Sequence, residues 1–410
     1  MSEHVRMILV RCSGRDRPGI TTGLLGVLAD SKAELYDMEQ VVVRERLTLD
    51  ILIGVTEGDD VLKELLFHAW ERDLQLDFEV VDPTPPRTGL PRFVVTVIGQ
   101  TLPAAAVGGV TGAIAAGGGN IERIERLSRY PVVSYEFVVV EGSIDQMRAA
   151  LLEAAAEHNV DVAIQRQGLE RRAKRLVVMD VDSTLIQDEV IELLAEEAGC
   201  LPEVRAVTER AMAGELDFEA SLTERVAKLA GTPVEVLDRV RERVTLTPGA
   251  RTFVRTLHRL GYTVALVSGG FEAVVAPIAA QLGIPRAVAN HLEVADGRLT
   301  GHVQGRVLDR PGKAQVLRDI AAQEGVPLEQ TVAIGDGAND LDMLAIAGLG
   351  IAFNAKPVVR AQADTAVSVP YLDAILFLLG IRRDEIEEAD AEDPSVVEGG
   401  WYPVPGIPPV

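Results

Sequence analysis

The chain has 410 residues, 47% of them apolar, which predicts two or three soluble globular domains with sizeable cores. A formal net charge of −22 argues against nucleic-acid binding and against docking on anionic membranes. The two cysteines, Cys12 and Cys200, have no metal-ligand spacing, which suits ordinary thiols in a reducing cytoplasm. There is no signal-peptide pattern and no apolar run of about eighteen residues, so we expect a cytoplasmic protein without a membrane span.

Strands and helices are expected to alternate through the first 167 residues in an order that occurs twice. Each set predicts a strand, a helix, two strands, a helix and a last strand, which is the βαββαβ or ferredoxin-like plan. A Pro-rich segment, 82–91, is expected to link domain 1–82 to domain 92–167. The predicted strands are 5–11, 34–43, 47–55 and 76–81, then 93–98, 121–127, 132–140 and 160–165. Four helices are predicted. The first ends near residue 30, the second spans 59–72, the third begins near residue 104 and the fourth spans 144–157.

The repeat is also visible in the residue types. Three residues of the first set recur 85 positions later, since Gly14, Pro18 and Gly23 correspond to Gly99, Pro103 and Gly108. A fixed period of this kind indicates two copies of one module.

The two copies, over about residues 5–166, resemble ACT domains, which are small βαββαβ modules that bind amino acids. The first copy carries the signature G-R-D-R-P-G-I, in which Gly and Pro let backbone amides turn toward an anionic group at a helix start. The second copy has lost the counterparts of Asp16, Arg17 and Gly19. The resemblance implies a free amino acid effector bound between paired modules, and therefore a homodimer, with candidate residues Asp16, Gly19, Gly23 and Gly108. The alternative is a ferredoxin-like pair used only for assembly.

A short apolar run at 176–179 predicts a buried parallel strand that ends on two nearby acids, Asp180 and Asp182. Ser183 and Thr184 follow and favour a turn or a helix start. Ligands collect outside the carboxyl ends of strands in open α/β sheets, so the two acids are expected to face a binding crevice. The alternative is a turn with two solvated aspartates.

Three further signals follow, two of them directly after predicted strands. Strand 262–267 ends at Ser268, Gly269 and Gly270, which suit phosphate binding but also occur in ordinary loops. Lys313 is expected near the start of a helix, where a lysine is usually a solvated charge. Strand 331–334 ends in a cluster of oxygen ligands suited to Mg²⁺, namely Asp336, Asn339 and Asp340.

Together these signals resemble the haloacid dehalogenase superfamily of aspartyl-phosphate phosphotransferases over residues 175–383. The resemblance implies a doubly wound, mostly parallel Rossmann-like α/β sheet and a phosphoaspartate intermediate. It implies that Asp180 is the nucleophile and that Asp182 is the general acid and base. Mg²⁺ would be held by Asp180, the backbone carbonyl of Asp182 and Asp336. Ser268, Gly269 and Lys313 would bind the phosphate oxygens. Asn339 and Asp340 would complete the metal's outer shell and orient Lys313, and Asn339 would also contact the substrate.

The helical, charged segment 188–244 lies between the first two core strands and is expected to form a cap over the site. Its details resemble the phosphoserine phosphatases. In that resemblance Glu189 binds the substrate ammonium, Arg225 its carboxylate, and Met212 and Phe218 shield the site. Without the resemblance, Met212 and Phe218 would be ordinary core residues. Glu189 and Arg225 would be solvated helix charges.

The resemblance implies Mg²⁺-dependent hydrolysis of O-phospho-L-serine to L-serine and phosphate, the last step of serine biosynthesis. Pairing with an amino-acid-binding module suggests feedback by L-serine. The alternatives are a phosphatase for another small phosphomonoester and an amino-acid sensor with a vestigial phosphatase half.

The end of the chain is expected to carry no site. The acidic run 384–393 has the composition of a disordered tail, and the Pro-rich segment 401–410 is uninformative.

Overall fold

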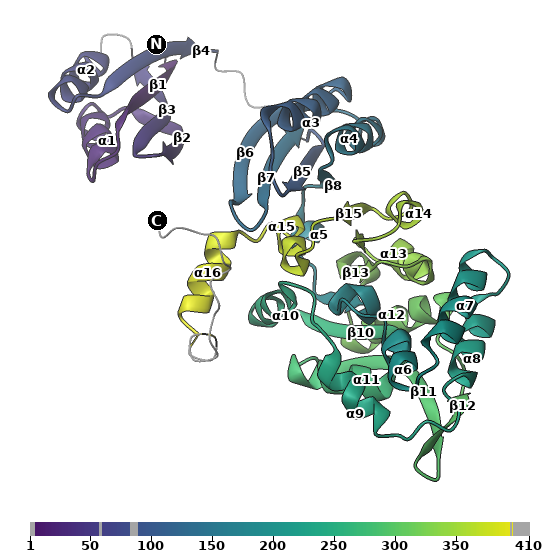
Figure 1. Cartoon of the computed structure of the whole chain (residues 1–410). Coiled ribbons are helices and arrows are strands. Elements are labelled where there is room, and N and C mark those ends of the chain that lie inside the picture. Colours follow the sequence, from purple (N-terminus) through teal and green to yellow (C-terminus); the bar gives the residue numbers. More distant parts are fainter. Residues whose placement is uncertain (1–4, 57–59, 83–88, 394–395, 397–410) are drawn as a thin grey trace. The chain divides into compact units, whose positions relative to one another are not determined.

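The computed structural model describes residues 5–56, 60–82, 89–393 and 396, in two compact units, Met1–Gly89 and Leu90–Val410 (Figure 1). The side chains of Val5, Glu170 and Met212 lie outside the described residues. Among the described helices, none is long and apolar enough to cross a bilayer.

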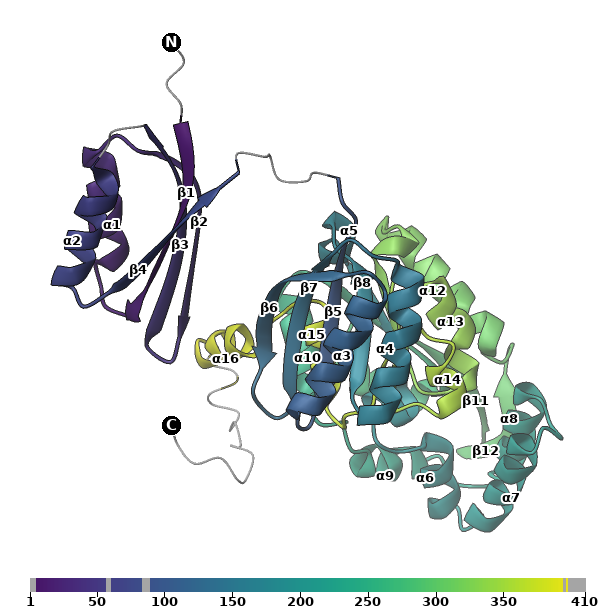
Figure 2. The ribbon, with the colours of Figure 1, turned by 90° about the horizontal axis from the view of Figure 1, so that it is seen from above.

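The first unit is a single βαββαβ module. Its antiparallel sheet has the order β2-β3-β1-β4, and α1 and α2 cover one face of it (Figure 2). Alternate residues of β1, namely Ile8, Val10 and Cys12, point into the core between sheet and helices. The elements are β1 (Val5–Arg15), α1 (Ile20–Asp30), β2 (Glu34–Val43), β3 (Arg46–Thr56), α2 (Val61–Glu71) and β4 (Gln75–Val81).

The second module repeats this plan within the second unit, with the sheet order β6-β7-β5-β8. One face of the sheet is covered by α3 and α4 (Figure 2). The other face is buried too, because Ile98 of β5 and Ala163 of β8 belong to the core of the following α/β domain. The elements are β5 (Arg92–Gly99), α3 (Ala104–Ala116), β6 (Asn120–Ser128), β7 (Val133–Val140), α4 (Ile144–His158) and β8 (Asp161–Arg166).

The repeat offset of 85 residues holds in the first strand of each module but not in the helix that follows. The inward residues Ile20, Leu24 and Leu28 of α1 correspond to Ala106, Val110 and Ile114 of α3, an offset of 86. Gly23 packs on His68 of the neighbouring helix, and Gly109 packs on His158 in the same way. The assignment of Gly108 as the partner of Gly23 is therefore wrong. A Cβ on Gly108 would meet nothing within 4 Å.

The third part is a seven-stranded sheet with the order β12-β11-β10-β9-β13-β14-β15, parallel except for β12. In central strand β9, Val177 and Met179 face one hydrophobic layer and Leu176 and Val178 the other. Both faces of the sheet are thus buried, which confirms the predicted doubly wound fold. The strands are β9 (Leu176–Met179), β10 (Thr263–Phe271), β11 (Arg286–Ala295), β12 (Arg298–Gln304), β13 (Thr331–Gly335), β14 (Gly350–Phe353) and β15 (Thr365–Val367).

Helices cover this sheet (Figure 1), and a further group of helices follows β9 and precedes β10 in the chain. That group, in the segment expected to form the cap, comprises α6 (Val190–Glu197), α7 (Leu201–Met212), α8 (Phe218–Ala227) and α9 (Val236–Arg243). The other helices are α5 (Leu169–Arg172), α10 (Ala250–Arg259), α11 (Glu272–Gln281), α12 (Arg310–Glu324), α13 (Leu341–Ile346), α14 (Pro357–Arg360), α15 (Ile375–Leu378) and α16 (Arg383–Ala391). Short turns of other helix types are η1 (Val181–Leu185), η2 (Leu328–Gln330), η3 (Ala338–Asp340) and η4 (Leu372–Ala374).

The expectation of a disordered tail at 384–393 is wrong, because α16 occupies most of it. Ile386 and Asp390 lie one helical turn apart and both are buried. Asp390 accepts hydrogen bonds from Arg255 (2.9 and 2.5 Å) and Arg259 (2.5 Å) of α10. The acidic composition predicted a solvated segment, but Asp390, on the buried face of this helix, pairs with Arg255 and Arg259. The Pro-rich segment 401–410 lies outside the described residues.

Candidate active site

The site is built where three neighbouring parallel strands end. Met179 of β9 lies in register with Leu266 of β10 and Ile334 of β13, so the residues that follow these three meet at one sheet edge. Asp180 is the first of them, and its backbone N–H donates to the carbonyl of Ile334 at 2.9 Å. The chain then turns sharply through η1, where Ser183 has a φ of 54°. Turns of this kind are common at functional sites.

A buried lysine holds two of the carboxylates together. Lys313 Nζ lies 2.8 Å from Asp180 Oδ1 and 2.7 Å from Asp340 Oδ1, and its side chain has no exposed surface. Burial alone would lower the pKa of Lys313, but the two carboxylates outweigh it and raise the pKa above its ordinary value. Lys313 is therefore a buried cation, and not the solvated charge that its place in the sequence allowed. It lies in the first turn of α12, which is capped by Asp309.

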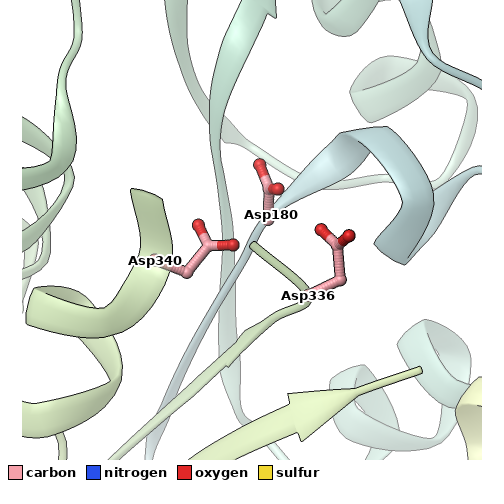
Figure 3. Close-up of side chains that lie close together, drawn as sticks. All are labelled: Asp180, Asp336 and Asp340. Carbon is pink, nitrogen blue, oxygen red and sulfur yellow. The ribbon is translucent and has the colours of Figure 1, made fainter. Parts of the chain in front are cut away.

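The carboxylates of Asp180, Asp336 and Asp340 converge from separate elements (Figure 3). One oxygen of each lies within 4.8 Å of the others. Burial, and then Asp340, raise the pKa of Asp180 well above its ordinary value, while Lys313 opposes the rise. Burial and the same neighbour raise the pKa of Asp336 to about 7. Such mutual repulsion favours a bound cation, and an all-oxygen donor set fits Mg²⁺.

Both carboxylate oxygens of Asp340 already accept a hydrogen bond. Its Oδ1 accepts from Lys313, and its Oδ2 accepts from the backbone N–H of Gly337 at 3.0 Å. Asp180 and Asp336 retain free oxygens, so they are the better metal ligands of the cluster. This agrees with the role predicted for Asp340, that of orienting Lys313.

The carboxylate of Asp182 is held apart from that cluster. Its Oδ1 accepts from the backbone N–H of Val190 at 2.9 Å, and its Oδ2 accepts from Ser268 Oγ at 3.3 Å. Burial, and then the charge of Glu189, raise its pKa to about 7. A carboxyl group with a pKa near neutrality can both donate and accept a proton.

Ser268, Gly269 and Gly270 belong to the last part of β10, so the predicted strand end at residue 267 is too early, and Gly269 lies against Phe218 of α8. Ser268 is fully buried, and its hydroxyl accepts from the backbone N–H of Gly270 at 2.8 Å. A Cβ on Gly269 would come within 2.9 Å of the Phe218 ring, so a larger residue there would require the ring to shift. Gly269 and Gly270 both line the cavity.

The segment expected to form the cap contributes side chains of opposite charge, Glu189 and Arg225, to the cavity lined by Asp180 and Asp336. The cavity has a volume of about 690 Å³. Glu189 precedes α6 and accepts from Ser183 Oγ at 2.8 Å, which ties the cap to the turn after Asp180. Arg225 of α8 is largely buried, and burial lowers the pKa of its guanidinium although Glu189 and Asp182 favour its charge. The predicted residues that line this cavity are Asp180, Asp182, Glu189, Phe218, Arg225, Gly269, Asp336 and Asn339.

The predicted effector residues of the first module lie around the start of α1. Asp16 and Gly19 lie in the loop before α1, where Gly19 has a φ of 91°, and Gly23 lies within α1. A cavity on this module runs along α2 and is lined by other residues: Val27, Asp60, Lys63, Glu64, Phe67, His68 and Glu71. Met212, predicted to shield the active site, has a side chain outside the described residues.

The sequence did not single out Asn290, Arg310 or Lys356. Asn290 is buried in β11, where its amide donates to the carbonyl of Gly269 at 2.9 Å and its Oδ1 accepts from Leu308 N at 2.7 Å. It therefore fixes the last part of β10 against the segment that leads to Lys313. Arg310 and Lys356 line the cavity. The sequence of β11 does not distinguish Asn290, because the strand also carries Arg286, His291 and Glu293, and the two cations had no signal either.

Comparison with known proteins agrees with this architecture. A family model described as haloacid dehalogenase-like hydrolase matches residues 177–345, and two described as ACT domain match residues 6–79 and 92–165. The chain is 53% identical to a phosphoserine phosphatase of Streptomyces coelicolor, over 97% of this chain and 98% of that one. It is 49% identical to the phosphoserine phosphatase SerB2 of Mycobacterium tuberculosis, over 95% of this chain and 97% of that one.

A solved structure supports the same relationship. The probable phosphoserine phosphatase of Vibrio cholerae superposes with a TM-score of 0.56 at 37% identity, over 70% of this chain and 86% of that one. Relatives that match at these identities over almost their whole length, together with the assembled strand-end site, show that the chain belongs to the phosphoserine phosphatase family of haloacid dehalogenase-like hydrolases, with two ACT domains at its N-terminus.

Proposed function

We propose that the protein hydrolyses O-phospho-L-serine to L-serine and phosphate, with Asp180 as the nucleophile. The observation that carries this proposal is the charge pattern of one cavity. Its floor has Asp180 held by Lys313, and its cap side has Glu189 and Arg225. A phosphate, an ammonium and a carboxylate group would each meet a side chain of suitable charge there. The named function of the relatives supports the same substrate.

The proposed reaction has two displacements at phosphorus. An oxygen of Asp180 attacks the phosphorus atom, the bond from phosphorus to the serine oxygen breaks, and Asp182 donates a proton to that leaving oxygen. Asp182 then accepts a proton from a water molecule whose oxygen attacks the phosphoaspartate. Phosphate leaves and the Asp180 carboxylate is restored. Lys313 already bonds Asp180 Oδ1, so it orients the nucleophile and offsets negative charge in the transition state.

We infer that Asp180, Asp336 and the backbone carbonyl of Asp182 hold Mg²⁺. The support is the all-oxygen cluster and the engagement of both Asp340 oxygens by other groups. When bound, Mg²⁺ would reduce the repulsion between the attacking carboxylate and the phosphate group.

We propose that the first ACT domain pairs with a second copy and that L-serine binds between the two. The edge strand β2 supports this assembly, since it exposes large apolar side chains along its length, among them Tyr36, Met38 and Val42. Such an edge is a template for pairing with another strand. The second ACT domain is less suited, because its outer sheet face is buried against the α/β domain.

The substrate assignment predicts a selective effect of Arg225→Ala. This change should lower kcat/KM for O-phospho-L-serine by about 10- to 100-fold, the value of a charge-assisted hydrogen bond of about 1.5–3 kcal/mol. Activity on O-phosphoethanolamine, which has no carboxylate, should change by less than about threefold. Steady-state kinetics on both substrates give the measurement.

The matched control is Arg205→Ala, because Arg205 is an exposed cap arginine that pairs with Glu192. It should leave both activities near those of the parent. Equal loss on both substrates in Arg225→Ala would favour the alternative of another small phosphomonoester. A parent enzyme that releases no phosphate from phosphoserine would refute the proposal.

Metal binding is expected to depend on pH. Asp336 must be ionised to bind Mg²⁺, and its pKa is about 7. Below that pH the carboxyl group is protonated, so Mg²⁺ affinity should fall by about tenfold per pH unit or more, because the pKa of Asp180, the second carboxylate ligand, is raised as well. Isothermal titration with Mg²⁺ from about pH 8 to about pH 6 tests this.

Asp336→Asn should abolish the binding. Asp319→Asn provides the control, because Asp319 is exposed on α12, outside the cavity lining, and accepts a hydrogen bond from Gln315. A Mg²⁺ affinity that is independent of pH, or that survives in Asp336→Asn, would contradict the metal assignment.

The assembly proposal predicts that Val42→Lys dissociates the dimer and removes L-serine binding, because it places a charge in an apolar interface. Ile124→Lys is the matched control, since Ile124 is exposed on β6, the corresponding edge strand of the second module. Sedimentation and L-serine titration of the full chain provide the readouts. A monomeric parent, or an unchanged dimer in Val42→Lys, would overturn the proposed interface.

A further inference from the structure

The proposed reaction gives no role to two cations of the active-site cavity, Arg310 and Lys356. Three basic side chains line the cavity, namely Arg225, Arg310 and Lys356. Arg225 is largely buried against the acids of the cap. Arg310 is paired with Asp342, at 2.6 Å from Nε and 2.5 Å from the terminal nitrogen. Lys356 is exposed, and within residues 5–56, 60–82, 89–393 and 396 no carboxylate forms an ion pair with it.

The backbone fixes the position of Lys356 while its side chain remains in solvent. Its carbonyl accepts from Val359 N at 2.9 Å and from Arg360 N at 3.1 Å, at the start of α14. The preceding Asn354 N donates to the carbonyl of Val367 at 2.8 Å, and Val359 is fully buried. The ammonium group is thus attached to a well-anchored turn, and Val358 and Val359 of the same turn also line the cavity.

The cavity is otherwise unfavourable for an anion approaching from solvent. Five acidic side chains line it, namely Asp180, Asp182, Glu189, Asp217 and Asp336. The whole chain carries a formal charge of −22. Phosphoserine itself has a net charge of about −1.5 to −2 near neutral pH, since its carboxylate and ammonium cancel. A field of like charge slows the association of such a substrate, and a local opposite charge restores it.

We propose that Lys356 recruits the anionic substrate at the solvent-exposed part of the cavity and so raises the rate of productive binding, an inference that rests on the proposed function. Lys356 is a recruiting residue and does not touch the reacting atoms. Its attraction acts through solvent over several ångströms, and salt therefore screens it.

The test is the salt dependence of kcat/KM for O-phospho-L-serine in the full-length enzyme with Mg²⁺. At an ionic strength of about 0.02 M, Lys356→Ala should lower kcat/KM by about three- to tenfold, and Lys356→Glu by more. At about 0.5 M the differences should shrink to less than about twofold. The value of kcat should stay near that of the parent throughout, and Lys356→Arg should retain the parent behaviour.

Lys228→Ala is the matched control. It removes the same charge from an exposed position at the end of α8, outside the cavity lining, and should have no salt-dependent effect. Equal effects of Lys356→Ala and Lys228→Ala, a loss in Lys356→Ala that salt does not reduce, or a fall in kcat would each overturn the recruiting role. A parent that does not hydrolyse phosphoserine would instead overturn the proposed function, so the two failures are distinguishable.

Discussion

The site depends on one constraint, the burial of Lys313 between Asp180 and Asp340. Three charged groups without solvent are tolerated because each has a partner at 2.7–2.8 Å. Removing one member of a buried pair typically costs about 3–5 kcal/mol, since the other charge remains unpaired. The arrangement therefore locks the ends of β9 and η3 to the start of α12. It also leaves Asp180 and Asp336 with oxygens directed at a shared space, which is the requirement for a metal and a phosphate group to meet there.

Much of the fold could be predicted from local pattern. The short apolar runs of β5, β9 and β13 predict buried strands by their composition and length, which do not depend on tertiary contacts. The predictions that were wrong concern features that depend on contacts between distant parts of the chain. The change of offset that makes Gly109 the counterpart of Gly23 follows from which helix face meets the neighbouring helix. Helix α16 forms because Asp390 reaches Arg255 and Arg259, which lie more than a hundred residues earlier in the chain.

The site residues also divide into those that the sequence pattern predicts and those that only the folded structure reveals. Asp180, Asp182 and Asp336 were predictable because strand ends in a parallel sheet meet at one edge, so adjacency follows from topology. Burial was not predictable. Nothing local distinguishes Lys313, which is fully buried, from Lys356, which is exposed in the lining of the same cavity. The role of Asn290 likewise depends on two loops that approach each other only in the folded chain.

The most direct test of the account is phosphate release from O-phospho-L-serine by purified Asp180→Asn beside the parent, each with Mg²⁺ and with Mg²⁺ chelated. An amide at this position keeps the size of the side chain but is no nucleophile toward phosphorus. We expect the parent enzyme to require Mg²⁺ and Asp180→Asn to release phosphate more slowly by about a thousandfold or more. Release by Asp180→Asn at the parent's rate would contradict it.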